Sequence, residues 1–320
     1  MLKIILPMFT ATSIIVVLVI VFAVKPKGDP PTSATSTENL KKQTLPADLP
    51  KLAFTPKRSG QDGPGFDKVS TQCQTAGRYI GQGGYVRESQ AEAVKLMEVI
   101  EQFSQSRTPQ RGFADRFMNG RDLYDPELKQ NLEIVVSALN LHVKAMIEEG
   151  KYDSAQEAAG ACFALGHALF NDNTRLMPRR TGLLLMRVSL QNYINAANAE
   201  RAAGRMDADA YQLAKSSTQP WFDAILAIET VWAKKLESIN NPKPNVGDLV
   251  RVADKDEDLS FRVFAVRRLG LARFERGDSS NQSAINSAIE SALSNDQPMI
   301  REAAESAQSL TVEQFRKVNR

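Results

Sequence analysis

The sequence DPELKQNLEIVVSALNLHVKAMIEEG, residues 125–150, decides the fold. It opens with Asp125-Pro126-Glu127, and a proline at the first helical position beside an acidic residue is a typical helix start. It closes with Gly150, a typical helix end. Between them, apolar residues recur three and four positions apart, the period of an amphipathic helix: Leu128, Leu132, Val135, Leu139, Val143 and Met146. The segment therefore predicts one long helix.

The same period extends to both sides of this segment. Upstream, Ala93, Leu96, Ile100 and Phe103 form another apolar face. Downstream, the pattern and its glycine and proline punctuation predict three further helices: from Lys151 through Leu169, from Pro178 to Ala203 before Gly204, and from Asp207 to about Ile239 with a bend or break at Pro220. We find no convincing strand in this body. The prediction is an all-α fold of antiparallel helical hairpins, resembling an α-solenoid.

The composition limits the classes of function. Positive and negative residues are interspersed and the net charge is +3, so we expect no nucleic-acid partner. Cys73 and Cys162 are too few and too distant for a disulfide scaffold or a zinc site, and whether they pair stays open. His142 lies on an apolar helix stripe, and Cys162 and His167 point about 140° apart on one helix. We therefore expect no catalytic residue, no cofactor and no metal site.

The N-terminal segment from Ile4 to Val24 contains no charged residue. Its helix of about 21 residues would be roughly 31 Å long, which matches the hydrocarbon core of a bilayer. A cleaved signal peptide has a shorter apolar region followed by small residues, whereas this one leads straight into Lys25. We therefore predict an uncleaved membrane anchor over residues 1–25, with these apolar positions in the bilayer: Ile4, Ile14, Val17, Phe22 and Val24.

Two arguments about the orientation of this anchor disagree. The flanking lysines, with Lys3 on one side and Lys25, Lys27, Lys41 and Lys42 on the other, favour a cytoplasmic C-terminal domain. A bare N-terminal anchor, however, commonly acts as a signal-anchor that delivers the C-terminal part of the chain across the membrane. We expect a single-pass protein whose N-terminus is cytoplasmic and whose domain lies on the far side.

Residues 26–66 separate the anchor from the helical body. Prolines interrupt this stretch repeatedly, and Ser, Thr, Gly and Lys replace periodic apolar residues. Such a composition buries too little surface to offset its ordering entropy. We predict a disordered linker with an end-to-end distance of roughly 35 Å.

One turn resembles a known repeat family. The run Gly150-Lys151-Tyr152-Asp153-Ser154-Ala155 is similar to the turn and second-helix opening of a tetratricopeptide repeat. Ala159 and Cys162 depart from that pattern, and the next similar turn, Gly204-Arg205-Met206-Asp207, comes after 54 residues instead of about 34. We interpret the turn as a generic helical hairpin within an all-helical domain over residues 67–244.

The C-terminal part contains an internal repeat with an offset of 39 residues. The run Asp256-Glu257-Asp258-Leu259-Ser260-Phe261-Arg262 precedes Ala265, and Asn295-Asp296-Gln297-Pro298-Met299-Ile300-Arg301 precedes Ala304. In both, an acidic or amide turn is followed by an apolar residue, an arginine and then an alanine. This pattern resembles the HEAT family of two-helix repeats, and we assign it to residues 245–320.

The HEAT resemblance implies roles for particular residues. Asp256, Asp258 and Asp296 would cap second helices, and Arg262 and Arg301 would stack as a ladder between repeats. The chain departs from the family where Asn295 replaces the first aspartate, and where Gln308 stands in place of Leu269. Two repeats are fewer than such stacks usually need, so they must lean on the preceding helices.

These features favour a membrane-tethered helical-repeat protein that presents a surface to a protein partner, as a scaffold or adaptor. Arg179 and Arg180 come directly after Pro178, and two cations in a first helical turn oppose the helix dipole. They are either plain solvated charges or part of an interaction surface facing acidic groups, phosphate or lipid headgroups. The alternative is a hydrolase whose Asp122, Asp125 and Glu148 converge in a helical cavity. A domain that only oligomerises is a third interpretation.

Overall fold

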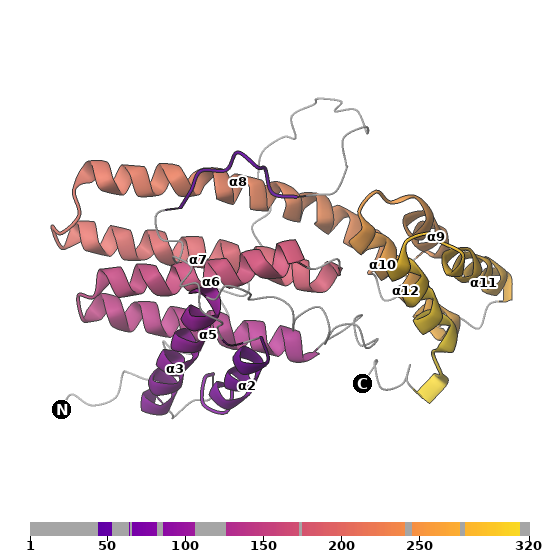
Figure 1. The fold of residues 1–320 in the computed structure, drawn as a ribbon, viewed down its shortest axis with the longest axis horizontal. Coiled ribbons are helices and arrows are strands. Elements are labelled where there is room, and N and C mark those ends of the chain that lie inside the picture. Colours follow the sequence, from indigo (N-terminus) through magenta and orange to yellow (C-terminus); the bar gives the residue numbers. More distant parts are fainter. Residues whose placement is uncertain are drawn as a thin grey trace, which may run out of the picture. The chain divides into compact units, whose positions relative to one another are not determined.

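The computed structural model describes residues 44–52, 64, 66–81, 86–105, 126–172, 175–240, 245–275 and 279–313. Within these ranges the chain forms ten helices and no strand, which confirms the predicted all-α fold (Figure 1). Residues 40–320 form one compact unit. The helices, labelled as in Figure 1, are α2 (Phe66–Ala76), α3 (Val86–Gln105), α5 (Pro126–Glu148), α6 (Tyr152–Asp172), α7 (Leu176–Ala202), α8 (Ala208–Ile239), α9 (Val246–Lys255), α10 (Leu259–Glu275), α11 (Ser279–Leu293) and α12 (Pro298–Ser309).

The apolar stripes of α3 and α5 face the interior, as predicted. Leu96 and Ile100 of α3 and Leu139 of α5 are fully buried. Helix α2 packs against both, α3 packs against α5 and α6, and these helices share one hydrophobic cluster. One buried polar contact joins them, because Asn131 Nδ2 donates a hydrogen bond to Ser70 Oγ at 3.0 Å.

The two predicted glycine turns have the same conformation. Gly150 and Gly204 both have a φ of +72°, which L side chains rarely adopt. In each turn, the glycine N–H and the next N–H donate to helix carbonyl oxygens three and five residues earlier, which is a Schellman motif. Arg205 Nη1 donates to the Gly150 carbonyl oxygen at 2.9 Å, and its guanidinium lies 5.5 Å from the Tyr152 ring centroid. The α5–α6 and α7–α8 turns therefore lie side by side.

Helices α6 and α7 approach each other through a pair of glycines. A Cβ placed on Gly166 would lie 2.8 Å from the Gly182 carbonyl oxygen, and one placed on Gly182 would lie 2.7 Å from the Phe170 amide nitrogen. Neither distance leaves room for a side chain. The two backbones are therefore in direct contact, and α6 lies between two hydrophobic clusters, one toward α3 and α5 and one toward α8.

Of the bend or break predicted at Pro220, the break is wrong, because helix α8 continues through this residue. Proline removes one backbone donor from a helix and usually interrupts it. Here Ala214 before the proline and Ile225 and Trp232 after it are all buried in the same cluster. Packing on both sides of Pro220 therefore holds the helix together through the proline.

A short segment without regular secondary structure, residues 44–52, lies against α8 (Figure 1) and contains a turn at Ala47 and Asp48. We call it the strap. Leu52 is buried in the core cluster, and Trp221 Nε1 of α8 donates a hydrogen bond to the Pro50 carbonyl oxygen at 2.8 Å. The predicted disordered linker over residues 26–66 is therefore corrected for this segment, because its leucines find apolar partners that the local sequence does not show. Residues 26–43 and 53–63 lie outside the described residues.

The predicted membrane anchor, including Ile4, Ile14, Val17, Phe22 and Val24, also lies outside the described residues. Among the residues that are described, no helix combines the length and the apolar composition needed to cross a bilayer.

The C-terminal helices form two stacked hairpins. Helices α9 and α10 pair, α11 and α12 pair, α9 packs against α11, and α10 packs against α12. Gly270 allows the close approach of α10 to α12, since a Cβ there would lie 2.8 Å from Ala307 Cβ. Almost every residue of α10 is buried, and a helix covered on all sides is a core element. The hydrophobic cluster runs without interruption from α6 to α12, so both predicted helical regions share one core.

Candidate functional site

The most constrained polar group in the described residues lies where α7 meets the start of α10. Asp258 precedes α10 and accepts a hydrogen bond from the Ser260 N–H at 2.9 Å, the helix-capping role predicted for it. Arg179 Nη1 of α7 donates to Asp258 Oδ1 at 3.0 Å, to Asp258 Oδ2 at 3.1 Å and to Ser260 Oγ at 2.6 Å. Ser260 Oγ also hydrogen-bonds to Asp258 Oδ1. We call Arg179, Asp258 and Ser260 the junction.

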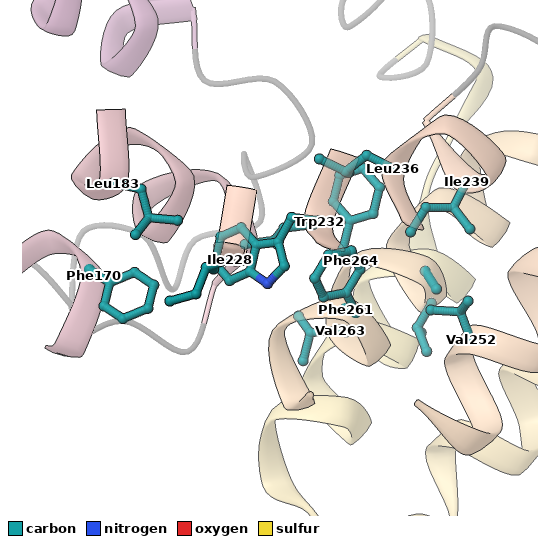
Figure 2. Close-up of a cluster of buried hydrophobic side chains, with 14 of the residues drawn as sticks. Phe170, Leu183, Ile228, Trp232, Leu236, Ile239, Val252, Phe261, Val263 and Phe264 are labelled. Atoms are coloured by element: carbon teal, nitrogen blue, oxygen red, sulfur yellow. The ribbon is translucent and has the colours of Figure 1, made fainter. Parts of the chain in front are cut away.

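Aromatic side chains enclose the junction. The Arg179 guanidinium lies 4.8 Å from the Phe170 ring centroid and 5.1 Å from that of Trp232. Trp232 in turn meets Phe261 edge to face at 5.6 Å, and Figure 2 shows Phe170, Trp232 and Phe261 coming together from three helices. Arg179 is 6% exposed and Asp258 is 2% exposed. A charge in such surroundings is stable only when it is paired, so the junction joins α6, α7, α8 and α10.

The junction corrects one predicted role. Both interpretations place Arg179 and Arg180 together on the surface, but Arg179 is buried and only Arg180 is exposed. The Asp258 carboxylate, 79 residues away in sequence, supplies the negative charge that offsets the unfavourable position of Arg179 at a helix start. Arg180 therefore remains as the one exposed member of the predicted pair.

Arg180 belongs to a partly exposed charged group on α7 and α8. Arg187 Nη1 lies 3.4 Å from Glu229 Oε2. Burial raises the pKa of Glu229, while Arg187 and Arg180 act in the opposite direction. This face of the molecule therefore presents two arginines around one carboxylate.

In the first predicted repeat, Asp256 is the C-cap residue of α9, so the role of capping α10 that was expected of it is corrected, and Arg262 bonds within its own helix pair. The Asp256 carboxylate accepts hydrogen bonds from Lys235 Nζ at 2.9 and 2.8 Å and from the Asp258 N–H at 2.9 Å. Arg262 Nε donates to the Ala253 carbonyl oxygen at 3.0 Å. Asp256 therefore ties α8 to the α9–α10 turn, and Arg262 closes the end of α9.

The second repeat uses a different residue at the same place. Asn295 Oδ1 accepts from the Gln297 N–H at 3.0 Å, as Asp256 does from Asp258. Arg301 Nη1 donates to the carbonyl oxygens of Asn295 at 2.7 Å and Asp296 at 3.0 Å. The N-cap residue of α12 is Gln297, without a side-chain hydrogen bond, so the capping role expected of Asp296 is corrected. Asn295 forms the turn, and Asp296 contributes its backbone oxygen.

The acidic residues of the alternative hydrolase interpretation do not form a site in the described part of the chain. Glu148 is 64% exposed and lies 3.9 Å from Lys144. Asp122 and Asp125 lie outside the described residues. Among the residues that are described, no group of His, Cys, Asp and Glu is placed to hold a metal ion.

The two cysteines are free thiols buried in one hydrophobic cluster. Burial raises the pKa of the Cys73 thiol to about 12, and burial also raises that of Cys162. Cys162 Sγ lies 3.7 Å from Met97 Sδ. Because the thiolate is the reactive form, these thiols are packing residues and not nucleophiles.

The structure also shows buried polar residues that the sequence pattern did not identify. Arg267 and Arg268 of α10 are 5% and 8% exposed, and Arg268 Nη1 donates to Glu275 Oε1 at 2.8 Å. On α6 and α8, Phe163 and Trp221 meet edge to face at 5.0 Å beside the strap. Apart from Arg268, the residues from Val263 to Ala272 around Arg267 are all apolar or glycine, which is the signal that could have indicated its burial.

Comparisons of this chain with models of protein families, with characterised proteins and with solved structures give no match.

Proposed function

We propose that this chain is a membrane-tethered helical-repeat scaffold or adaptor that presents its helical surface to a protein partner. The observation that carries this proposal is the α9–α12 stack, in which like helices lie on like helices. Stacked two-helix units form extended surfaces that bind other proteins. The α9–α12 stack is continuous with the core of the preceding helices, which provides the support that two repeats need.

Residues 245–320 are, in this proposal, a pair of HEAT-like repeats. The Asx turn formed by Asp256 recurs at Asn295, and the equivalent arginines Arg262 and Arg301 each bind a backbone carbonyl oxygen, at the end of α9 in the first unit and in the turn before α12 in the second. The capping residue and the arginine ladder of that family would correspond to Asp258, Arg262 and Arg301. Capping by Asp256 and Asp296 is the feature of the family pattern that this chain lacks.

The proposal places the N-terminal apolar segment, Ile4–Val24, in a lipid bilayer and the helical body on the far side of the membrane. The support is the uncharged length of about 21 residues, sufficient to cross the hydrocarbon core. A reporter enzyme fused after Arg320 tests the orientation. Activity only outside the cytoplasm is expected, and activity only in the cytoplasm would overturn this part of the proposal.

Site-specific photocrosslinking tests the partner. A photoreactive amino acid replaces Arg180, which is exposed beside Arg187 and Glu229, in the full-length protein in its native membrane. The matched control replaces Arg87, an exposed arginine on α3. We expect a discrete crosslinked protein from position 180 that is absent from position 87. Equal labelling at both positions, or none at either, would contradict an adaptor surface that includes Arg180.

A further inference from the structure

The contacts of the strap with the body include two of its leucines and the carbonyl oxygen of Pro50. Its sequence is Thr-Leu-Pro-Ala-Asp-Leu-Pro-Lys-Leu, residues 44–52. Leu52 is buried and Leu45 packs against the same cluster. Pro46 and Pro50 fix their own backbone φ near −65°, which limits the conformations of the strap before binding, and a turn follows Pro46 at Ala47 and Asp48. The strap therefore binds with two leucines and a prearranged backbone.

The receiving surface of α8 is built around Trp221. Its indole N–H donates to the Pro50 carbonyl oxygen at 2.8 Å. Its ring meets Phe163 edge to face at 5.0 Å and lies 6.1 Å from the His167 ring, so that both rings of α6 hold it in position. An aromatic platform with an N–H aimed at a carbonyl oxygen is how proteins bind extended proline-containing peptides. We call Trp221, together with the Phe163 and His167 rings that it contacts and the apolar cluster beneath Leu45 and Leu52, the strap site.

The strap has the properties of a segment that opens readily. Thr44, Pro46, Ala47, Asp48 and Lys51 are exposed, so five of its nine residues face away from the body. A segment with little buried surface opens at a low free energy compared with the core. Opening uncovers Trp221 without disturbing the α6–α7 contact.

We propose that the strap site is a peptide-binding site for a leucine- and proline-containing segment of a partner protein, and that the strap occupies it in the absence of that partner. This inference rests on the proposed adaptor function and gives it a place and a regulation. The strap is an intramolecular competitor, so a partner binds only to the fraction of molecules in which the strap is open. Its own sequence defines the chemistry that the site accepts.

The competition predicts an unusual pattern of mutational effects. Leu45→Ser with Leu52→Ser weakens only the strap, so the site becomes open and a peptide binds at least about tenfold more tightly than to the wild type. Trp221→Phe removes the N–H donor from the strap and from the added peptide alike. In the wild-type background Trp221→Phe weakens the competing strap as much as the added peptide, so the measured peptide affinity stays the same. In the open-strap variant only the peptide is affected, and Trp221→Phe weakens its binding by about fivefold.

The experiment measures fluorescence anisotropy of a labelled synthetic peptide, residues 44–52, with the full-length protein in detergent micelles. Leu213→Ser, at a 70% exposed leucine of α8, is the matched control and leaves binding unchanged. Thermal unfolding by circular dichroism verifies that each variant is folded. As a second readout on the wild type, excess peptide carrying Lys51→Gln, which trypsin does not cut, accelerates tryptic cleavage of the protein after Lys51, because it displaces the strap; Lys51 is exposed in the strap, so this change leaves its contacts intact.

The outcomes decide the inference. The inference is overturned if the peptide binds the open-strap variant no more tightly than the wild type, or if Trp221→Phe leaves peptide binding unchanged in that variant. It is also overturned if excess peptide leaves the rate of cleavage after Lys51 unchanged. If light scattering shows that the wild-type protein is a dimer and that excess peptide converts it to monomers, the strap site binds the strap of a second copy and not a partner protein, which also overturns the inference. The assay contains no native membrane and no native partner, so the crosslinking experiment at Arg180 can fail independently.

Discussion

Replacing Arg179 with methionine, Arg179→Met, tests the junction most directly. Methionine keeps much of the side-chain volume and removes the charge. Asp258 then stays buried with its Ser260 contacts but without its cationic partner. Removing one partner of a buried ion pair typically destabilises a protein by about 3–5 kcal/mol, because the other charge is left uncompensated. The lost contacts of the guanidinium with Phe170 and Trp232 contribute to the same loss.

A loss of this size is measurable in two ways. For a unit as large as residues 40–320, it lowers the melting temperature by about 5–8 °C. Urea unfolding gives the free energy directly, and Trp232 emission reports the junction itself because the ring lies 5.1 Å from the guanidinium. The control is Arg180→Met, which changes the neighbouring exposed arginine and should alter stability by about 0.5 kcal/mol or less.

The double variant Arg179→Met with Asp258→Leu separates pairing from packing. Replacing both charges with apolar groups restores much of the stability that Arg179→Met loses, since no unpaired carboxylate remains. Two results would refute the reasoning. One is an Arg179→Met variant as stable as Arg180→Met, and the other is a double variant that loses more free energy of unfolding than the two single variants lose together.

Three further predictions concern packing and protonation. Gly182→Ala lowers the free energy of unfolding by about 1–3 kcal/mol despite the better helix propensity of alanine, because its Cβ meets the α6 backbone; an unchanged or higher stability in urea would contradict the direct α6–α7 contact. Burial lowers the pKa of His142, and the charges of Glu98 and Glu149 act weakly in the opposite direction. The contribution of His142 to the free energy of unfolding is therefore complete above its unfolded-state pKa near 6.5 and falls as the pH decreases below that value. His142→Leu should flatten this part of a stability–pH profile, and an unaltered slope would contradict the prediction. Cys73 and Cys162 should resist a thiol reagent at pH 8 until urea unfolds the chain, and rapid labelling of the folded protein would be the contrary result.

Local patterns carried the sequence predictions that the structure confirms. The stripes of α3 and α5, the stops at Gly150 and Gly204, and the cap at Asp258 all depend on residues within a few positions of one another. The period of a helix and the geometry of a turn act over that range. Such features can be recognised without knowledge of the tertiary structure.

Features that depend on distant contacts were not predictable in the same way. Arg179 finds Asp258 after 79 residues, and Trp221 finds Pro50 after 171. The strap has the composition of a linker, and only the apolar surface of a remote helix makes it an ordered segment. Helix α8 likewise contains a proline that predicts an interruption, and tertiary packing overrides that local preference.

The continuous core from α6 to α12 also governs how the chain must fold as it is synthesised. Helices α6, α7 and α8 leave the ribosome first, with Trp232 and Arg179 facing a place that α10 has yet to fill. Until Phe261 and Asp258 arrive, the nascent chain exposes an apolar surface with an unneutralised arginine at its centre. We therefore expect a chain cut short before α10 to keep this apolar surface exposed and to aggregate more readily than the full-length chain.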